Sequence, residues 1–68
     1  MRYAVVIEKA PKNYSAYVPD LPGCVATGKT RAAVHREILK AIRFHLAGMR
    51  EDGVPAPTPT SVCEYVDA

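Results

Sequence analysis

The sequence predicts a single α+β domain of the order βββαβ, with one amphipathic helix against one face of the sheet. Three observations predict this fold. The first 28 residues hold three short β-prone runs separated by turn residues. A helical period of apolar residues then extends to residue 52, and a last apolar run follows three prolines. A chain of 68 residues has room for one domain and only a small core.

The first two strands are expected at residues 2–9 and 14–18, joined by a turn that contains Pro and Asn. Both faces of the first run are largely apolar, which is typical of a central strand covered on both sides. Residues 19–23, Pro-Asp-Leu-Pro-Gly, cannot be regular structure, because proline lacks a backbone donor and glycine permits positive φ. A short third strand is expected at 24–27.

The helix is expected to begin after Thr30, a good N-cap residue, and to extend to Asp52. Gly53 stands where a left-handed residue ends many helices, and Pro55 prevents continuation. Gly48 lies inside the helix, where glycine costs about 1 kcal/mol relative to alanine. A close approach of another backbone is one reason for a glycine there.

The last strand is expected at residues 61–66, after an extended, proline-rich connection over 54–60. A right-handed crossover would pair this strand parallel to the first, which gives the sheet order 3-2-1-4. One helix covers only one face of such a sheet, so the other face stays open. Self-association is the simplest way to cover it, and we expect a homodimer or higher homo-oligomer. Strands one and two are expected in its interface, and strand four is a further candidate for it.

Charge and cysteine content limit which partners and which cellular compartment are expected. Nine Lys and Arg against seven Asp and Glu give a net charge of +2, far from the dense positive stripe of nucleic-acid binders, so no direct DNA binding is expected. Cys24 and Cys63 are too few for a disulfide framework or a structural zinc site, and are expected on opposite edge strands, too far apart to bridge. No signal peptide or membrane span is present, so we expect a cytoplasmic protein with reduced thiols.

No catalytic, metal or cofactor site is expected. Glu51 and Asp52 are the only adjacent carboxylates, and neighbours on a helix point about 100° apart. His35 and His45 would lie some 80° apart on the helix, so they would not chelate a metal together. Cys24 with His35 could imitate a thiol nucleophile and its base, but a small buried cysteine is the commoner case.

One combination of residues resembles a known family. Residues 17–24, Tyr-Val-Pro-Asp-Leu-Pro-Gly-Cys, are followed by Gly28-x-Thr30, an amphipathic helix and Gly-Val-Pro-Ala-Pro at 53–57. This pattern, over residues 3–60, resembles the HicB-like antitoxins, whose N-terminal domain looks like a pared-down ribonuclease H fold. The resemblance implies a domain that oligomerises and neutralises a small HicA-type toxin by covering its active surface. Such toxins resemble double-stranded-RNA-binding domains and cleave messenger RNA.

The sequence departs from that family in two respects. Members commonly carry acidic residues where Lys29, Arg31 and Ala32 stand here. Positive charge at a helix N-terminus opposes the helix macrodipole. The substitutions also remove negative charge that could pair with a basic toxin. Many members also append a C-terminal DNA-binding domain, whereas this sequence ends at Ala68, so we expect one domain over 1–68 without such a module.

Tyr17, Asp20 and Leu21 are the candidate partner-binding residues. Prolines and a glycine would hold Asp20 and Leu21 in a fixed loop, and Tyr17 would supply an aromatic anchor on an exposed sheet face. The alternative is that this loop only turns the chain. Two other functions stay open: a stand-alone homo-oligomer with a structural or regulatory role, and a ribonuclease H-like nuclease. Strand one offers the nuclease only Glu8 as a metal-binding carboxylate.

Overall fold

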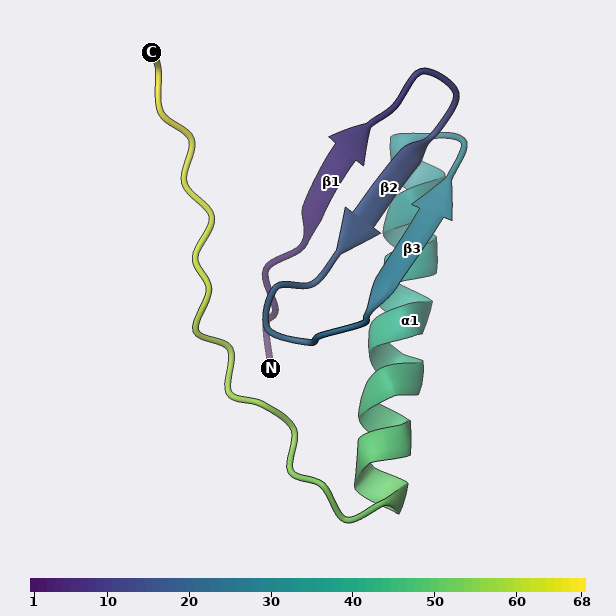
Figure 1. The fold of residues 1–68 in the computed structure, drawn as a ribbon, viewed down its shortest axis with the longest axis vertical. Coiled ribbons are helices and arrows are strands. Elements are labelled where there is room, and N and C mark those ends of the chain that lie inside the picture. The colour runs from purple at the N-terminus through teal and green to yellow at the C-terminus, as the bar shows by residue number, and fades with distance from the viewer.

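A computed structural model describes all 68 residues and shows a three-stranded antiparallel sheet with one helix packed across one face (Figure 1). The strands are β1 (Val6–Lys9), β2 (Tyr14–Tyr17) and β3 (Val25–Gly28), in the spatial order β1-β2-β3. The helix α1 (Arg31–Glu51) follows directly. The expected α+β class, the meander and the single helix are therefore confirmed.

The strand register decides which side chains face the helix. Ala16 in β2 pairs with Ala26 in β3, and Ala16 is buried beneath α1. The next residue, Tyr17, pairs with Val6 on one side and Val25 on the other. Because neighbouring residues of a strand point to opposite faces, this second row faces away from the helix. One face of the sheet is therefore open, as the sequence predicts.

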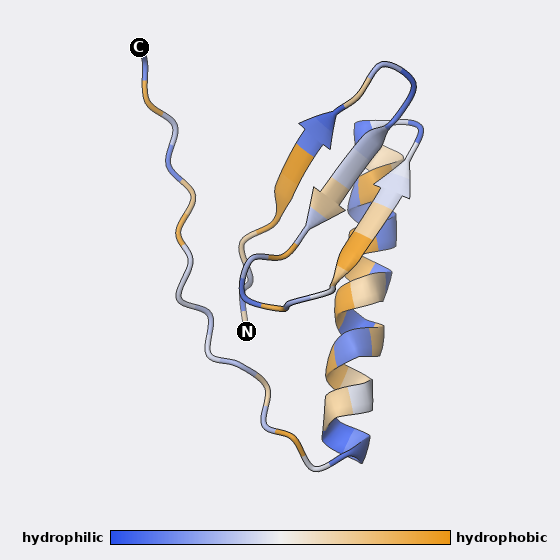
Figure 2. Cartoon of the chain, viewed as in Figure 1, coloured by the Kyte–Doolittle hydropathy of each residue, from blue (hydrophilic) through white to orange (hydrophobic).

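The core is small and draws on the sheet, the loop before β3 and the helix. Leu21 and Val34 are fully buried, although Leu21 belongs to a loop rather than to a strand. Figure 2 shows hydrophobic residues in the strands and in bands along α1, separated by polar ones. The fully buried set is Ala16, Val18, Leu21, Cys24, Val34 and Ile38.

Both ends of α1 lie where the sequence places them, within one residue. The Thr30 hydroxyl accepts a hydrogen bond from the backbone N–H of Ala33 at 3.0 Å, as an N-cap residue does. At the other end, Gly53 has φ +71°, and the N–H of Val54 donates to the carbonyl of Met49 at 2.8 Å. The helix therefore begins and ends for local chemical reasons.

Two glycines differ in what surrounds them. A Cβ added to Gly28 would lie 2.5 Å from the backbone nitrogen of Val34 and 2.9 Å from the carbonyl carbon of Ala33. The first turn of α1 therefore approaches the end of β3 more closely than any side chain permits. A Cβ on Gly48 would meet nothing within 4 Å, so the close contact considered for Gly48 is wrong.

The expected fourth strand does not form, and the order 3-2-1-4 is wrong for that strand. Residues 54–68 are extended and run beyond the outer side of β1, but no backbone hydrogen bond joins them to it (Figure 1). The N–H groups of Thr60 and Ser61, at the start of the expected strand, donate to Asp20 instead. These bonds use donors that a parallel ladder along β1 would need at its start.

Candidate partner-binding surface

The face of the sheet opposite α1 is termed the open sheet face. Its centre is an apolar row in which Tyr17 is 42% exposed and Val25 is 64% exposed, with Val6 beside them. A polar row, Glu8–Ser15–Thr27, borders it. An exposed aromatic ring between two branched aliphatic side chains is a typical anchor of a protein interface. By strand alternation the face comprises Val6, Glu8, Ser15, Tyr17, Val25 and Thr27.

Charge is distributed unevenly between the helix and the rest of the chain. α1 carries five Lys or Arg against two Glu, a net charge of +3, while all other residues carry four against five, a net charge of −1. At 100° per residue, the exposed side chains of Arg36, Lys40, Arg43 and Arg50 fall within about 80° of arc, opposite the buried stripe. The open sheet face has no base, and Glu8 is its only charge.

The Asp20 carboxylate is fully occupied. Its Oδ2 accepts from the backbone N–H groups of Thr60 at 3.0 Å and Ser61 at 2.9 Å, and its Oδ1 accepts from their hydroxyls at 3.1 and 2.9 Å. These bonds, those of Ser61 first, hold the pKa of Asp20 below its ordinary value. We call Asp20, Thr60 and Ser61 the Asp20 clasp, since they fasten the C-terminal segment to the loop between β2 and β3.

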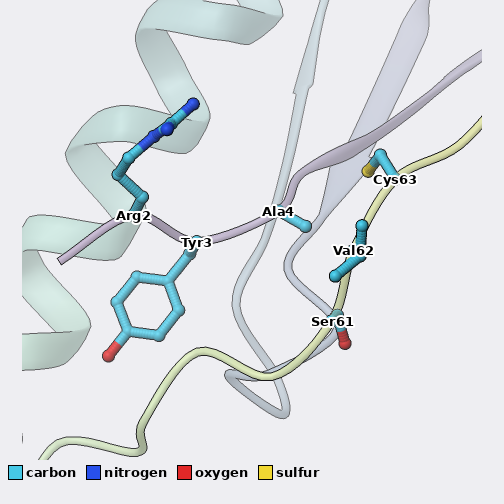
Figure 3. A pocket seen from close by; sticks show the side chains of 6 residues that line it. All are labelled: Arg2, Tyr3, Ala4, Ser61, Val62 and Cys63. Atoms are coloured by element: carbon cyan, nitrogen blue, oxygen red, sulfur yellow. The ribbon is translucent and has the colours of Figure 1, made fainter.

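A second contact holds the C-terminal segment near the N-terminus. The Tyr3 hydroxyl donates to the carbonyl of Pro57 at 2.6 Å. Beyond this point the two ends of the chain face each other across an open hollow (Figure 3). The hollow separates them where a ladder would otherwise form. Its lining residues are Arg2, Tyr3, Ala4, Ser61, Val62 and Cys63.

The structure places the three candidate residues in three different situations. Tyr17 lies on the open sheet face, as expected. Asp20 is half-buried, and its carboxylate is committed to the clasp. Leu21 is fully buried, so its side chain belongs to the core and offers no surface to a partner. The hairpin register could have found Val6 as a neighbour of Tyr17, whereas no local sequence signal joins Asp20 to residues 40 positions away.

The His, Cys, Asp and Glu side chains do not cluster at one place. No group of three His, Cys, Asp or Glu residues could hold a metal ion. Both cysteines are free: Cys63 is exposed, while Cys24 is buried, and burial raises the pKa of the Cys24 thiol. A thiol with a raised pKa is a poor nucleophile at neutral pH. No helix of the chain has both the length and the apolar character that crossing a bilayer requires.

Replacing Asp20 with Asn is expected to release residues 57–68 while the domain stays folded. Asn keeps one oxygen for the two N–H groups, but its NH₂ group cannot accept from the hydroxyls of Thr60 and Ser61, and the remaining bonds lose the charge of the carboxylate. Limited proteolysis should cut the released segment, with little change in helical circular dichroism. Asp67→Asn, which removes an equal charge from an unbonded carboxylate, is the matched control. Equal protection of the segment in both variants would contradict the clasp.

The same clasp predicts a pH dependence. The folded pKa of Asp20 is lowered, so its ionised carboxylate stabilises the folded chain. This stabilisation is fully present above the unfolded carboxyl pKa of about 3.9 and is lost as the pH falls through the lower folded value.

Similar proteins agree with the sequence pattern. The sequence model of a family described as HicB_like antitoxin of bacterial toxin-antitoxin system matches residues 3–68. A 14.9 kDa protein from the rep-hol intergenic region of Haemophilus phage HP1 is 36% identical over 67 residues, which cover 98% of this chain and 50% of the relative. A UPF0150 protein of Thermoplasma acidophilum is 34% identical over 84% of each chain. A UPF0150 protein of Helicobacter pylori is 43% identical over 69% of this chain and 65% of its own.

A solved structure described as the HicA3 and HicB3 toxin-antitoxin complex contains a chain similar to this one, with a TM-score of 0.74 and 28% sequence identity. The match covers 88% of this chain and 70% of that chain. This chain spans only half the length of the phage relative, so those proteins have regions that it does not match.

Proposed function

The chain belongs to the HicB-like antitoxin family of bacterial toxin–antitoxin systems, and from this premise we propose that it binds and neutralises a HicA-type toxin in the cytoplasm. The similar fold in a complex of HicA3 with HicB3 supports this proposal. Neutralisation of this kind needs no catalytic step in the antitoxin, because covering the active surface of the toxin is sufficient. The proposal concerns the domain described here, whatever else its longer relatives do.

One observation carries the proposal: the open sheet face is apolar at its centre and free of positive charge. A toxin that binds RNA presents basic side chains to the phosphate backbone. Such a surface is repelled by the basic side of α1 and meets no like charge on the open sheet face. Tyr17 can then pack against the apolar parts of the toxin, and Glu8 can pair with one of its cations.

The strands also lower the cost of ordering the surface. Tyr17 projects from the central strand, which is hydrogen-bonded on both sides, so its backbone is fixed before binding. A tyrosine has only two side-chain torsions to restrict when it packs against a partner. Most of the entropy that an interface loop would lose is therefore already absent.

The test is co-expression with a HicA-type toxin, followed by growth measurement and co-purification. Tyr17→Lys should abolish rescue of growth and weaken binding about 30-fold or more, as expected when a central aromatic anchor is lost. Leu39→Lys is the control, because Leu39 is 39% exposed on α1 and lines a hollow with Val5 and Ile7, on the face of the sheet opposite Tyr17. The control should rescue growth like the unmodified chain.

Two results would contradict the proposal. Failure of the unmodified chain to bind or neutralise the toxin would favour the stand-alone homo-oligomer instead. Full binding by a folded Tyr17→Lys variant would move the interface away from the open sheet face.

A further inference from the structure

The helix covers only part of the sheet face on which it packs. α1 lies across β3 and β2, while β1, at the edge of the sheet, extends beyond it (Figure 1). Along β1 and the residues before it, the side chains that point to the helix side are apolar and only half-buried: Tyr3, Val5 and Ile7. The flank of α1 and the inner side of β1 therefore leave an apolar groove between them.

This groove has the size and the lining of a small-molecule site. Two hollows of about 430 and 420 Å³ share Val5, Ile7, Arg31 and Tyr65, so they adjoin and form one groove. Ligand pockets typically measure about 300 to 1,000 Å³ and are mostly apolar, with a few polar groups that fix the orientation of the ligand. We call this surface the β1–α1 groove. Its apolar lining also includes Met1, Tyr3, Ile38, Leu39 and Ile42.

The β1–α1 groove is elongated, and its two ends differ. Arg31 and Ile42 both line it, and they are about 17 Å apart along the helix axis at 1.5 Å per residue. The Ile42 end is apolar, with Met1 and Tyr3 beside it. The Arg31 end is polar, because Lys9 and Tyr14 line it there. An occupant that fits both ends is a long molecule with one apolar and one polar end.

The charged side chains that line the groove are all basic. Lys9 and Arg31 lie where β1 ends and α1 begins, and no Asp or Glu lines the groove with them. The one ion pair of the chain joins Lys40 to Glu37, so Lys9 and Arg31 have no carboxylate partner. An anionic head group therefore meets two unpaired cations at this end, and a guanidinium can hold a carboxylate through two parallel hydrogen bonds.

We propose that the β1–α1 groove binds an amphipathic carboxylate, a small molecule with an aliphatic chain and a terminal carboxylate. The aliphatic chain lies against Val5, Leu39 and Ile42, and the carboxylate lies at Arg31 and Lys9. A free inorganic anion would leave the apolar part of the groove wet, and a cationic amphiphile would be repelled at the Arg31 end. The groove lies on the sheet face opposite Tyr17, so this site is independent of toxin binding.

Titration of the full chain with decanoate, followed by amide chemical shifts, tests the site below the concentration at which micelles form. Decanoate should bind saturably with one molecule per chain and shift the amides of Ile7, Arg31 and Leu39. Decanol, which has the same chain without the charge, should bind about tenfold more weakly, as expected when a charge-assisted pair is lost. Decylammonium should bind more weakly still, and acetate, the head group without the chain, should not bind at the same concentrations.

Two variants locate the two ends of the ligand. Arg31→Gln should lower the affinity for decanoate about tenfold and leave that for decanol unchanged. Arg36→Gln is its matched control, because Arg36 is an exposed arginine of α1 that does not line the groove.

Leu39→Asp places a negative charge in the wall of the groove and should lower the affinity for decanoate about 30-fold or more. Phe44→Asp is its control, because Phe44 is 83% exposed on α1 and lies outside the groove. Circular dichroism shows whether each variant is folded, and Arg31→Gln serves if Leu39→Asp is not.

Several results would overturn the proposal. They are the absence of saturable decanoate binding, equal affinity for decanoate and decylammonium, and full affinity for decanoate in a folded Arg31→Gln variant. Equal losses in the two control variants would do the same. A groove covered by the C-terminal segment or by a second copy would leave decanoate unbound, with the same conclusion. Tyr17→Lys should keep decanoate binding, so failure of this site and failure of toxin binding give different results.

Discussion

Gly28→Ala is expected to lower the free energy of unfolding by about 3 kcal/mol, the upper range for inserting a methyl group into a packed site. The added Cβ would lie 2.5 Å from the backbone nitrogen of Val34 and 2.9 Å from its Cα. These are backbone atoms of the first helical turn, which cannot rotate aside as a flexible side chain can. The helix must therefore move away from β3, and the contact of Val34 with the core is weakened.

Gly48→Ala is the matched control for this substitution. It adds the same methyl group to open space in the middle of α1, where alanine is favoured over glycine by about 1 kcal/mol. Urea denaturation followed by circular dichroism should show opposite shifts of the midpoint for the two variants. A midpoint for Gly28→Ala at or above that of the unmodified chain would show that α1 and β3 are not in close contact.

Leu21→Ala is expected to cost about 2 to 5 kcal/mol, the range for truncating a buried leucine. Leu21 is 0% exposed and belongs to a core of only six buried residues. A domain of this size has a total stability of about 3 to 10 kcal/mol, so the variant should be largely unfolded or close to it at 37 °C. The β2–β3 loop is therefore a structural part of the domain.

Leu39→Ala provides the comparison, because Leu39 is 39% exposed and its truncation leaves little cavity. Thermal unfolding should separate the two variants clearly, with the large loss confined to Leu21→Ala. Toxin binding by a Leu21 variant should fall only in proportion to its unfolded fraction. Reduced binding by a fully folded Leu21→Ala protein would return this residue to the interface.

Local chemistry explains which elements the sequence predicts well. The cap at Thr30 and the left-handed Gly53 fix the ends of α1 through bonds within a few residues, so they can be recognised from the sequence. The hairpin of β1 and β2 is short-range as well, and its register places Tyr17 on the open sheet face. These features depend on residues that are neighbours along the chain.

The C-terminal segment shows where such reasoning stops. Residues 61–66 have the composition of a strand, but whether they pair depends on a distant carboxylate that binds Thr60 and Ser61. Because of the same contact, the Asp20 carboxylate holds the C-terminal segment and is not free to bind a partner. The burial of Leu21 likewise depends on how the helix packs over the loop. Interactions over 40 residues leave no periodic trace in the sequence.

The basic side chains on α1 affect the orientation in which charged partners approach the protein. Charge is uneven, with +3 on the helix and −1 on the rest of the chain. In the field of a cationic molecule the helix is turned away before contact, so a larger share of collisions involve another face of the protein. Added salt shortens the reach of this torque to about 8 Å at physiological ionic strength. Because the chain as a whole carries +2, added salt also screens the net repulsion from a cationic partner, so the association rate should rise with salt, while dissociation is governed by the packing around Tyr17.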